Sequence, residues 1–207
     1  MRSSKLMMPD HRDHYLLFGA AWNGVGVRLK STALHAAHYR SLFDGGTALP
    51  PEIHFEQDAA LFDTVANATA AAENVLFAAY VLTVFPSVPR PFNKALKQRQ
   101  DQMVERVIGA SRTQRLGEFL RDSFDKKAAH LLYELRDFLL HRGRLSRNHF
   151  VGGPFSGKMT VARNAKSHSS EWENDLVFGE TLLDEPLDWL KEHCDGAGRQ
   201  MCDAMPE

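Results

Sequence analysis

The sequence predicts an all-α fold, an up-and-down helical bundle of four to five helices with a small β-hairpin insertion before the C-terminal helix. Two long stretches repeat apolar residues at steps of three and four, as on one face of a helix. Short segments that alternate apolar and polar residues and are separated by glycines, as in a β-hairpin, occur only after residue 147. With 207 residues, 43% hydrophobic and 25% charged, the composition is that of a globular domain. We therefore expect a single domain over residues 1–207, with a flexible leader at residues 1–10.

The first half of the chain predicts two long helices. Residues 10–44 read as one helix, broken or frayed near Gly24-Val25-Gly26 and ended by Gly45-Gly46. A loop with two prolines, Pro50 and Pro51, precedes a second helix from Glu56 to Val84. Small residues in the centre of that helix would let a neighbouring helix approach closely. Its apolar stripe consists of Leu61, Val65, Ala68, Ala72, Val75, Leu76, Ala79 and Leu82.

The second half begins with a proline-rich connection at Phe85–Pro91, which is unsuited to a helix. A helix is expected from Phe92 to Ile108, followed by a break at Gly109-Ala110-Ser111. Residues Arg112–His141 then carry the strongest periodicity in the chain and predict one continuous helix. The apolar stripe of that helix consists of Leu116, Leu120, Phe124, Ala128, Leu131, Leu135 and Phe138.

The segment 148–182 is expected to form the hairpin insertion, and residues 184–203 the C-terminal helix, with Pro186 in its first turn. Residues Gly152–Lys158 match the glycine and lysine spacing of a phosphate-binding loop. Met159 stands where that motif requires Ser or Thr to hold magnesium, and no helix is expected to follow. We interpret these glycines as a hairpin turn, and we expect no cofactor.

Charge is distributed unevenly along the chain. Residues 171–207 contain eleven acidic and two basic residues, a net of −9, whereas residues 1–170 contain 15 acidic and 23 basic residues, a net of +8. A basic body is compatible with a nucleic-acid surface, and equally with a protein interface or two solvated faces. Cys194 and Cys202 are too far apart on one helix for a disulfide and are read as reduced thiols. We expect a cytoplasmic protein, because the N-terminus lacks the apolar region of a signal peptide and no run approaches the roughly 20 apolar residues needed to span a bilayer.

Residues 131–150 contain the candidate chemistry. Arg136 and His141 point about 140° apart on a helix, with about 7.5 Å between them along the axis. Asp137 and His141 are an i, i+4 pair, so the carboxylate can hold one ring nitrogen and fix the tautomer. Gly143 suits the position just past the helix end, which places His141 in the last turn. An arginine fork beside a titratable imidazole suits phosphate chemistry.

This pattern resembles the HEPN superfamily of helical ribonucleases and nucleic-acid-associated domains. The signature of that family is an arginine followed after four to six residues by a histidine, near the end of a long helix. Here it reads Arg136-Asp137-Phe138-Leu139-Leu140-His141. The small-residue stretch Asn67–Glu73 resembles the helix that packs against the motif helix, and the likeness covers roughly residues 56–147.

The resemblance implies a metal-independent endoribonuclease that acts through the 2′-hydroxyl of RNA, with a role as a toxin or phage-defence effector. His141 would transfer protons, Arg136 would stabilise phosphoryl charge, and Asp137 would orient His141. The family usually pairs its motif helices in a homodimer, which predicts a composite site. Candidate RNA-binding residues are Arg142, Arg144 and Arg147, and candidate supporting residues are Glu73, Asn67 and Tyr133.

Two other functions remain open. One is a non-catalytic HEPN-like module that binds RNA or a protein partner, such as an antitoxin, in a defence or stress complex. The other is a metal site built from the pairs His11/His14 and His35/His38, each spaced to share a helix face. The second pair lacks a carboxylate at matching helical spacing, which favours structural or surface histidines. We expect no metal.

Overall fold

The computed structural model describes residues 12–43, 50–84, 99–141, 147–149, 159–161, 176–178 and 181–205. Within these ranges the chain is helical apart from three short strands and the turns between elements, which confirms the all-α class. The helices are α1 (Arg12–Ser41), α2 (Pro51–Val84), α4 (Gln100–Gly109), α5 (Gln114–Phe124), α6 (Lys127–His141) and α7 (Asp184–Ala204). The leader expected at residues 1–10 and the connection at 85–91 lie outside the described residues.

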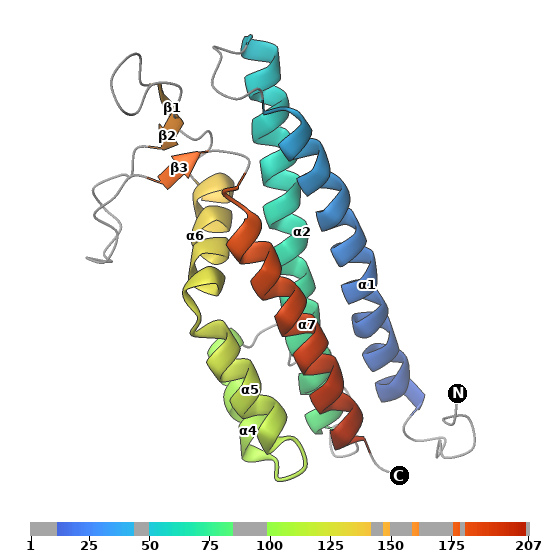
Figure 1. The fold of residues 1–207 in the computed structure, drawn as a ribbon. Helices are drawn as coiled ribbons and strands as arrows, with labels where there is room; N and C mark the ends of the chain where they lie inside the picture. Colours follow the sequence, from blue (N-terminus) through green and yellow to red (C-terminus); the bar gives the residue numbers. More distant parts are fainter. Residues whose placement is uncertain are drawn as a thin grey trace.

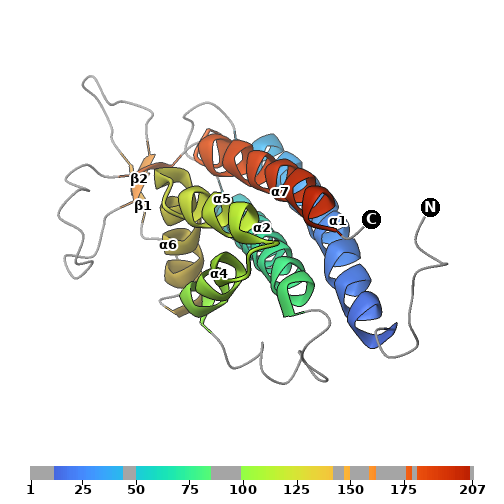
Figure 2. The ribbon, with the colours of Figure 1, turned by 90° about the horizontal axis from the view of Figure 1, so that it is seen from below.

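Helix α2 is the centre of the arrangement. It contacts α1 on one side and α4, α6 and α7 on the other (Figures 1 and 2). All eight residues of its predicted apolar stripe are buried, with relative exposures of 8% or less. The stripe prediction is therefore confirmed, and the alanines explain how one helix packs against several neighbours at once.

Helix α2 is nevertheless long and apolar enough to cross a membrane by length and composition over Pro51–Thr83, although Asp63, Asn67 and Glu73 interrupt its apolar residues. About two thirds of the most apolar part of this helix is buried against the rest of the chain. Central position in the core accounts for this composition, because a helix surrounded by other helices needs apolar residues on most of its faces.

Helix α1 is continuous through Gly24-Val25-Gly26, so the predicted break is wrong. At Gly24, a Cβ atom would lie 2.7 Å from Nδ2 of Asn74 on α2. This glycine therefore serves the close approach of two long helices rather than a bend.

The single helix predicted over Arg112–His141 is also wrong, because α5 ends at Phe124 and α6 begins at Lys127. The Ser123 carbonyl accepts a hydrogen bond from Trp189 Nε1 of α7 at 2.8 Å. Asp125 is the residue just past the end of α5, and its backbone N–H donates to the carbonyls of Arg121 and Ser123. The break thus coincides with a contact from the far end of the chain, and the apolar stripe continues across it.

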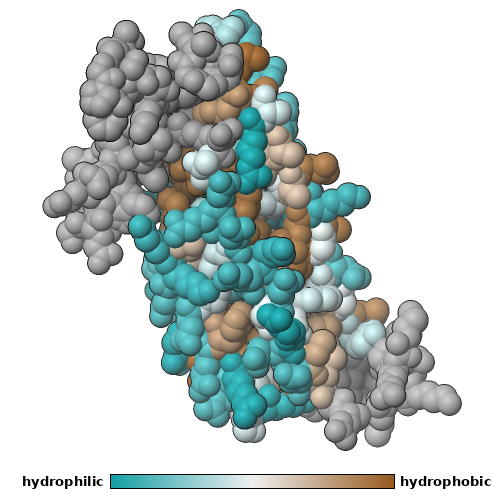
Figure 3. All heavy atoms as spheres, in the orientation of Figure 1, coloured by the Kyte–Doolittle hydropathy of each residue, from teal (hydrophilic) through white to brown (hydrophobic). Residues whose placement is uncertain are grey.

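Three strands separate α6 from α7 in the chain, namely β1 (Arg147–His149), β2 (Met159–Val161) and β3 (Leu176–Phe178). They form an antiparallel sheet in the order β1-β2-β3, with Asn148 opposite Thr160 and Thr160 opposite Val177. Helix α7 begins with Asp184 and Glu185, whose charges suit a helix N-terminus, and the predicted C-terminal helix is confirmed. Polar side chains gather over α5 and α7 in the view of Figure 3.

Candidate functional site

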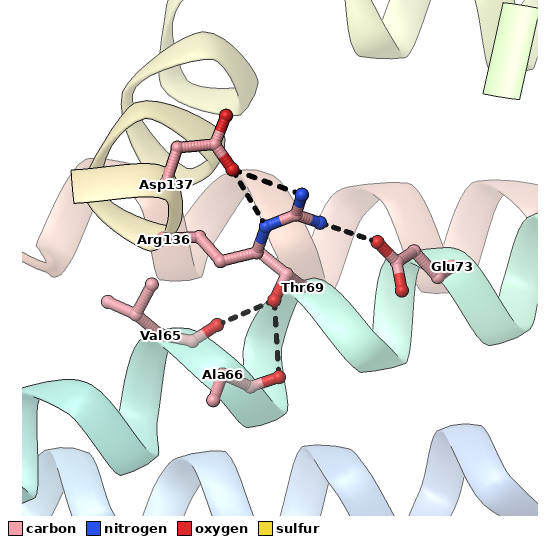
Figure 4. A network of polar contacts seen from close by, with 6 residues as sticks. All are labelled: Val65, Ala66, Thr69, Glu73, Arg136 and Asp137. Atoms are coloured by element: carbon pink, nitrogen blue, oxygen red, sulfur yellow. Dashed lines mark hydrogen bonds and ion pairs between the residues drawn. The ribbon is translucent and has the colours of Figure 1, made fainter. Parts of the chain in front are cut away.

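Arg136 of α6 lies between two carboxylates (Figure 4). Its Nη1 donates to Oε1 of Glu73 on α2 at 2.7 Å. Its Nε donates to Oδ1 of Asp137 at 3.1 Å, and Nη2 lies 3.0 Å from the same oxygen. Glu73, one of the candidate supporting residues, therefore contacts Arg136 directly, and it is also a half-exposed surface carboxylate. Carboxylates from two helices fix the orientation of one guanidinium at the α2–α6 contact.

Tyr133 supports the same side chain from one turn earlier on α6. The guanidinium carbon of Arg136 lies 5.3 Å from the centre of the Tyr133 ring, a cation–π distance. The Tyr133 hydroxyl is buried and has no hydrogen-bond partner among the described residues. Burial raises the pKa of Tyr133, the negative charge of Glu73 adds to the rise, and Arg136 opposes it. Tyr133 thus stays neutral, and its ring packs against the guanidinium of Arg136.

The cluster of Arg136, Glu73 and Asp137 carries a formal charge of −1. The Arg136 side chain is 29% exposed, against 53% for Glu73 and 60% for Asp137. A guanidinium has five N–H donors, two on each terminal nitrogen, so these contacts leave donors for a further acceptor. The site is partly open to solvent. An anion that binds there would accept hydrogen bonds from Arg136 while the guanidinium still contacts both carboxylates.

The predicted role of Asp137 in orienting His141 stays a prediction. The carboxylate of Asp137 contacts Arg136 in the structure. His141 ends α6, but its side chain lies outside the described part of the chain. Arg142 and Arg144 lie outside the described residues too, and for Arg147 the structure describes only its place in β1.

Asn67 does not belong to this site, so its assignment as a supporting residue is wrong. Its Oδ1 accepts from Nη1 of Arg28 on α1 at 2.8 Å, and its Nδ2 donates to the Asp63 carbonyl at 2.8 Å. Six residues separate Asn67 from Glu73, which places the two side chains about 120° apart around α2. Asn67 consequently faces α1, whereas Glu73 faces α6.

The histidine pairs do not assemble a metal site among the described residues, where no three His, Cys, Asp or Glu side chains group together. His35 Nδ1 lies 3.7 Å from Oδ2 of Asp63, and His14 is buried. His11 lies outside the described residues. Cys194 and Cys202 are free thiols in the structure, the first buried and the second exposed.

A second polar cluster, missed from the sequence, joins α5 to α7. Ser123 Oγ and His193 Nδ1 lie 2.8 Å apart, and Trp189 Nε1 lies 3.1 Å from the same hydroxyl. His193 is fully buried, and its ring packs against Trp189, Phe124 and Phe119. Burial lowers the pKa of His193 to about 4, with a further contribution from Lys126. With no access to solvent this cluster is structural, and its only sequence signal was the four-residue spacing of Trp189 and His193.

Comparisons of the chain with protein-family models, with curated proteins and with solved structures found no match. The likeness to HEPN domains therefore rests on the Arg136–His141 pattern and the helices around it.

Proposed function

We propose that this chain is a metal-independent endoribonuclease of the HEPN type. The observation that carries the proposal is the placement of Arg136, partly exposed and fixed by Glu73 and Asp137. It lies five residues before His141, which ends the same helix. A fixed guanidinium and a titratable imidazole are the groups that cleavage of a phosphodiester needs, and one helix supplies both of them here.

The reaction needs a base for the 2′-hydroxyl and an acid for the leaving group. The 2′-oxygen attacks phosphorus, the bond from phosphorus to the 5′-oxygen breaks, and that oxygen gains a proton. The products are a 2′,3′-cyclic phosphate and a 5′-hydroxyl. In this scheme His141 moves the proton and Arg136 stabilises charge on the phosphoryl oxygens. Because two carboxylates fix Arg136 in advance, little orientational freedom is lost when the phosphate binds.

One histidine does not conveniently serve as base and acid in a single step. The proposal therefore includes an isologous homodimer in which two motif helices supply two arginines and two histidines to one cleft. Arg142, Arg144 and Arg147 would bind flanking phosphates without reading base sequence. The chain would be an up-and-down bundle whose hairpin insertion brings Arg147 towards the site.

The test is cleavage of single-stranded RNA in EDTA by the wild type, Arg136→Lys and His141→Ala. Lysine keeps the charge but loses the fork, so Arg136→Lys should lower the rate at least tenfold, and His141→Ala should abolish cleavage. Arg121→Lys is a matched control, because Arg121 forms an exposed 2.7 Å ion pair with Glu105 elsewhere on the surface. Cleavage that stops on chelation, or survives in His141→Ala, would contradict the mechanism.

A second candidate is a non-catalytic module that binds RNA or a protein in a defence or stress complex. It is favoured by the net negative charge of the Arg136 cluster, because a guanidinium with two carboxylates is already neutralised. In that case Arg136→Lys leaves RNA or protein binding largely intact, and the wild type cuts nothing.

The cellular setting is part of the same proposal. We propose a cytoplasmic protein that acts as a toxin or phage-defence effector, with an antitoxin or other protein as a partner. Coexpression with a cognate antitoxin should relieve growth inhibition caused by the wild type, and His141→Ala should cause none.

A further inference from the structure

Four ring side chains form a row that leads from the interior of α7 to the guanidinium of Arg136. The rings of Trp189 and His193 on α7 lie 6.1 and 4.9 Å from the ring of Phe124, which ends α5. Phe124 in turn meets Tyr133 of α6 edge-to-face, with ring centroids 6.2 Å apart and planes at 65°. The Tyr133 ring lies 5.3 Å from the guanidinium carbon of Arg136. Three helices thus contribute to one continuous row of contacts.

We propose that Tyr133 is the positioning residue for Arg136 and that Phe124 holds the Tyr133 ring in place. In this arrangement neither aromatic residue touches the substrate, and both act through the guanidinium. The placement of Arg136 does not depend on ribonuclease activity. The kinetic effects described below rest on the proposed function.

The carboxylates of Glu73 and Asp137 orient Arg136 before substrate binds, but neither is shielded from water. They are 53% and 60% exposed, and ion pairs at such exposure are weakened by salt. They also accept hydrogen bonds at the edge of the guanidinium, which is the part that binds a phosphate. A further contact that is insensitive to salt and to phosphate would keep Arg136 in place while it acts.

The Tyr133 ring provides such a contact. A cation beside an aromatic face is attracted by the π electrons of the ring, and this interaction uses none of the N–H donors. The attraction is stronger where water is excluded, and Tyr133 packs against the core with its hydroxyl buried. The guanidinium can therefore bind a phosphate at its edge while Tyr133 holds it.

The hydroxyl of Tyr133 indicates that the ring, rather than the oxygen, makes the contact that matters. The oxygen is buried and has no hydrogen-bond partner among the described residues. Phenylalanine at this position keeps the aromatic face, whereas leucine keeps apolar volume and loses the face. Tyr133→Phe should therefore preserve the position of Arg136, and Tyr133→Leu should not.

Phe124 gives the Tyr133 ring a defined orientation. A side chain on one helix has several staggered rotamers, and an edge-to-face contact with a neighbouring ring favours one of them. Phe124 is itself packed against Trp189 and His193, both of which are buried. The orientation of Arg136 on α6 therefore depends on residues of α5 and α7.

The first test needs no RNA. It follows the NMR signal of the Arg136 Nε–H group, which donates to Asp137 and is assigned by its loss in Arg136→Lys. In about 1 M sodium chloride, where exposed ion pairs are screened, the wild-type group should stay ordered. Tyr133→Leu should make it mobile, with an order parameter below about 0.6, and Phe124→Leu should do so in part. Tyr133→Phe should behave as the wild type.

The second test measures cleavage of single-stranded RNA in EDTA by the same variants. Tyr133→Leu should lower kcat about tenfold or more and change KM much less, because Arg136 acts on charge that grows in the transition state. Tyr133→Phe should restore most of the lost rate. Phe43→Leu is a matched control, because Phe43 is a partly buried ring that meets Tyr39 edge-to-face at 5.0 Å, just past the end of α1. It should change neither the Arg136 signal nor kcat.

Circular dichroism first shows that each variant is folded, and Tyr133→Met replaces Tyr133→Leu if the leucine variant is not. An Arg136 signal that stays ordered in the folded variant without the ring would overturn the proposal, as would a wild-type signal that becomes mobile in high salt. If Tyr133→Phe loosens Arg136 as much as Tyr133→Leu does, the hydroxyl holds it and the ring does not. An ordered signal in Phe124→Leu removes Phe124 from the row. If the wild type cuts no RNA but Arg136 loosens as expected, the ribonuclease proposal fails and the positioning role of Tyr133 stands.

Discussion

The buried imidazole of His193 should make the stability of this protein depend on pH. Its Nδ1 lies 2.8 Å from the Ser123 hydroxyl, and its Nε2 has no hydrogen-bond partner among the described residues. Protonation would place a charge and a second N–H in surroundings formed by Phe119, Phe124 and Trp189. Removal from water disfavours the charged form, which is why the pKa falls to about 4 from the ordinary 6.5.

The sign and size of the effect follow from this shift. Below pH 6.5 the unfolded chain binds a proton that the folded chain rejects, so the free energy of unfolding falls as the pH is lowered. The contribution of His193 is complete above pH 6.5 and is lost between pH 6.5 and about 4. A difference of about 2.5 pKa units corresponds to about 3 kcal/mol in full, with about 2 kcal/mol already lost at pH 5. That is a substantial part of the 5–15 kcal/mol typical of a domain.

Urea denaturation between pH 7.5 and 4.5 measures this contribution. His193→Leu removes the titrating group, so its free energy of unfolding should fall less steeply with pH than that of the wild type, whatever the offset at pH 7.5. His130→Gln, at an exposed position on α6, is the control and should follow the wild type. If the curve of His193→Leu runs parallel to that of the wild type from pH 6.5 to 4.5, the imidazole is not excluded from water as argued.

Further predictions concern glycines and the Arg136 site. Gly26→Ala should raise the free energy of unfolding by up to about 1 kcal/mol, since no atom of the described residues lies within 4 Å of the added Cβ. Gly117→Ala should lower it by about 1–3 kcal/mol, because its Cβ would lie 2.5 Å from the backbone of α4. Equal effects in urea melts would contradict the packing argument. Glu73→Gln should change stability by less than about 1 kcal/mol, as for an exposed ion pair. It should nevertheless slow RNA cleavage by releasing Arg136, and an unchanged rate would show that Glu73 does not position this side chain.

Much of the helical architecture could be predicted from periodicity. The stripes along α2 and along α5–α6 are buried or partly buried as the spacing indicated. Helix α7 begins at Asp184, where acidic residues and Pro186 signalled a helix start. Such signals are local, since a core-facing helix must repeat apolar residues at its own period wherever it lies in the fold.

The errors occur where one segment depends on another that is distant in the chain. Nothing between Phe124 and Lys127 signals a break, and the hydrogen bond that Trp189 of α7 donates to the Ser123 carbonyl at this point joins residues far apart in the chain. Gly24 looked like a helix breaker, but its role is to let Asn74 of α2 approach. Asn67 was assigned to the wrong side of α2 because spacing alone does not tell which neighbour covers which face.

For the site, the sequence by itself determined that Arg136, Asp137 and His141 share the last turns of one helix. It also singled out Glu73 as a candidate partner. Only the tertiary structure decided that Glu73 lies within 2.7 Å of Arg136 and that Asp137 binds the same guanidinium. The same holds for the buried pairing of Ser123 with His193 across α5 and α7. Periodicity fixes which face of a helix is apolar, but which polar groups meet across two helices depends on their crossing and register, and these are set by the packing of the whole core.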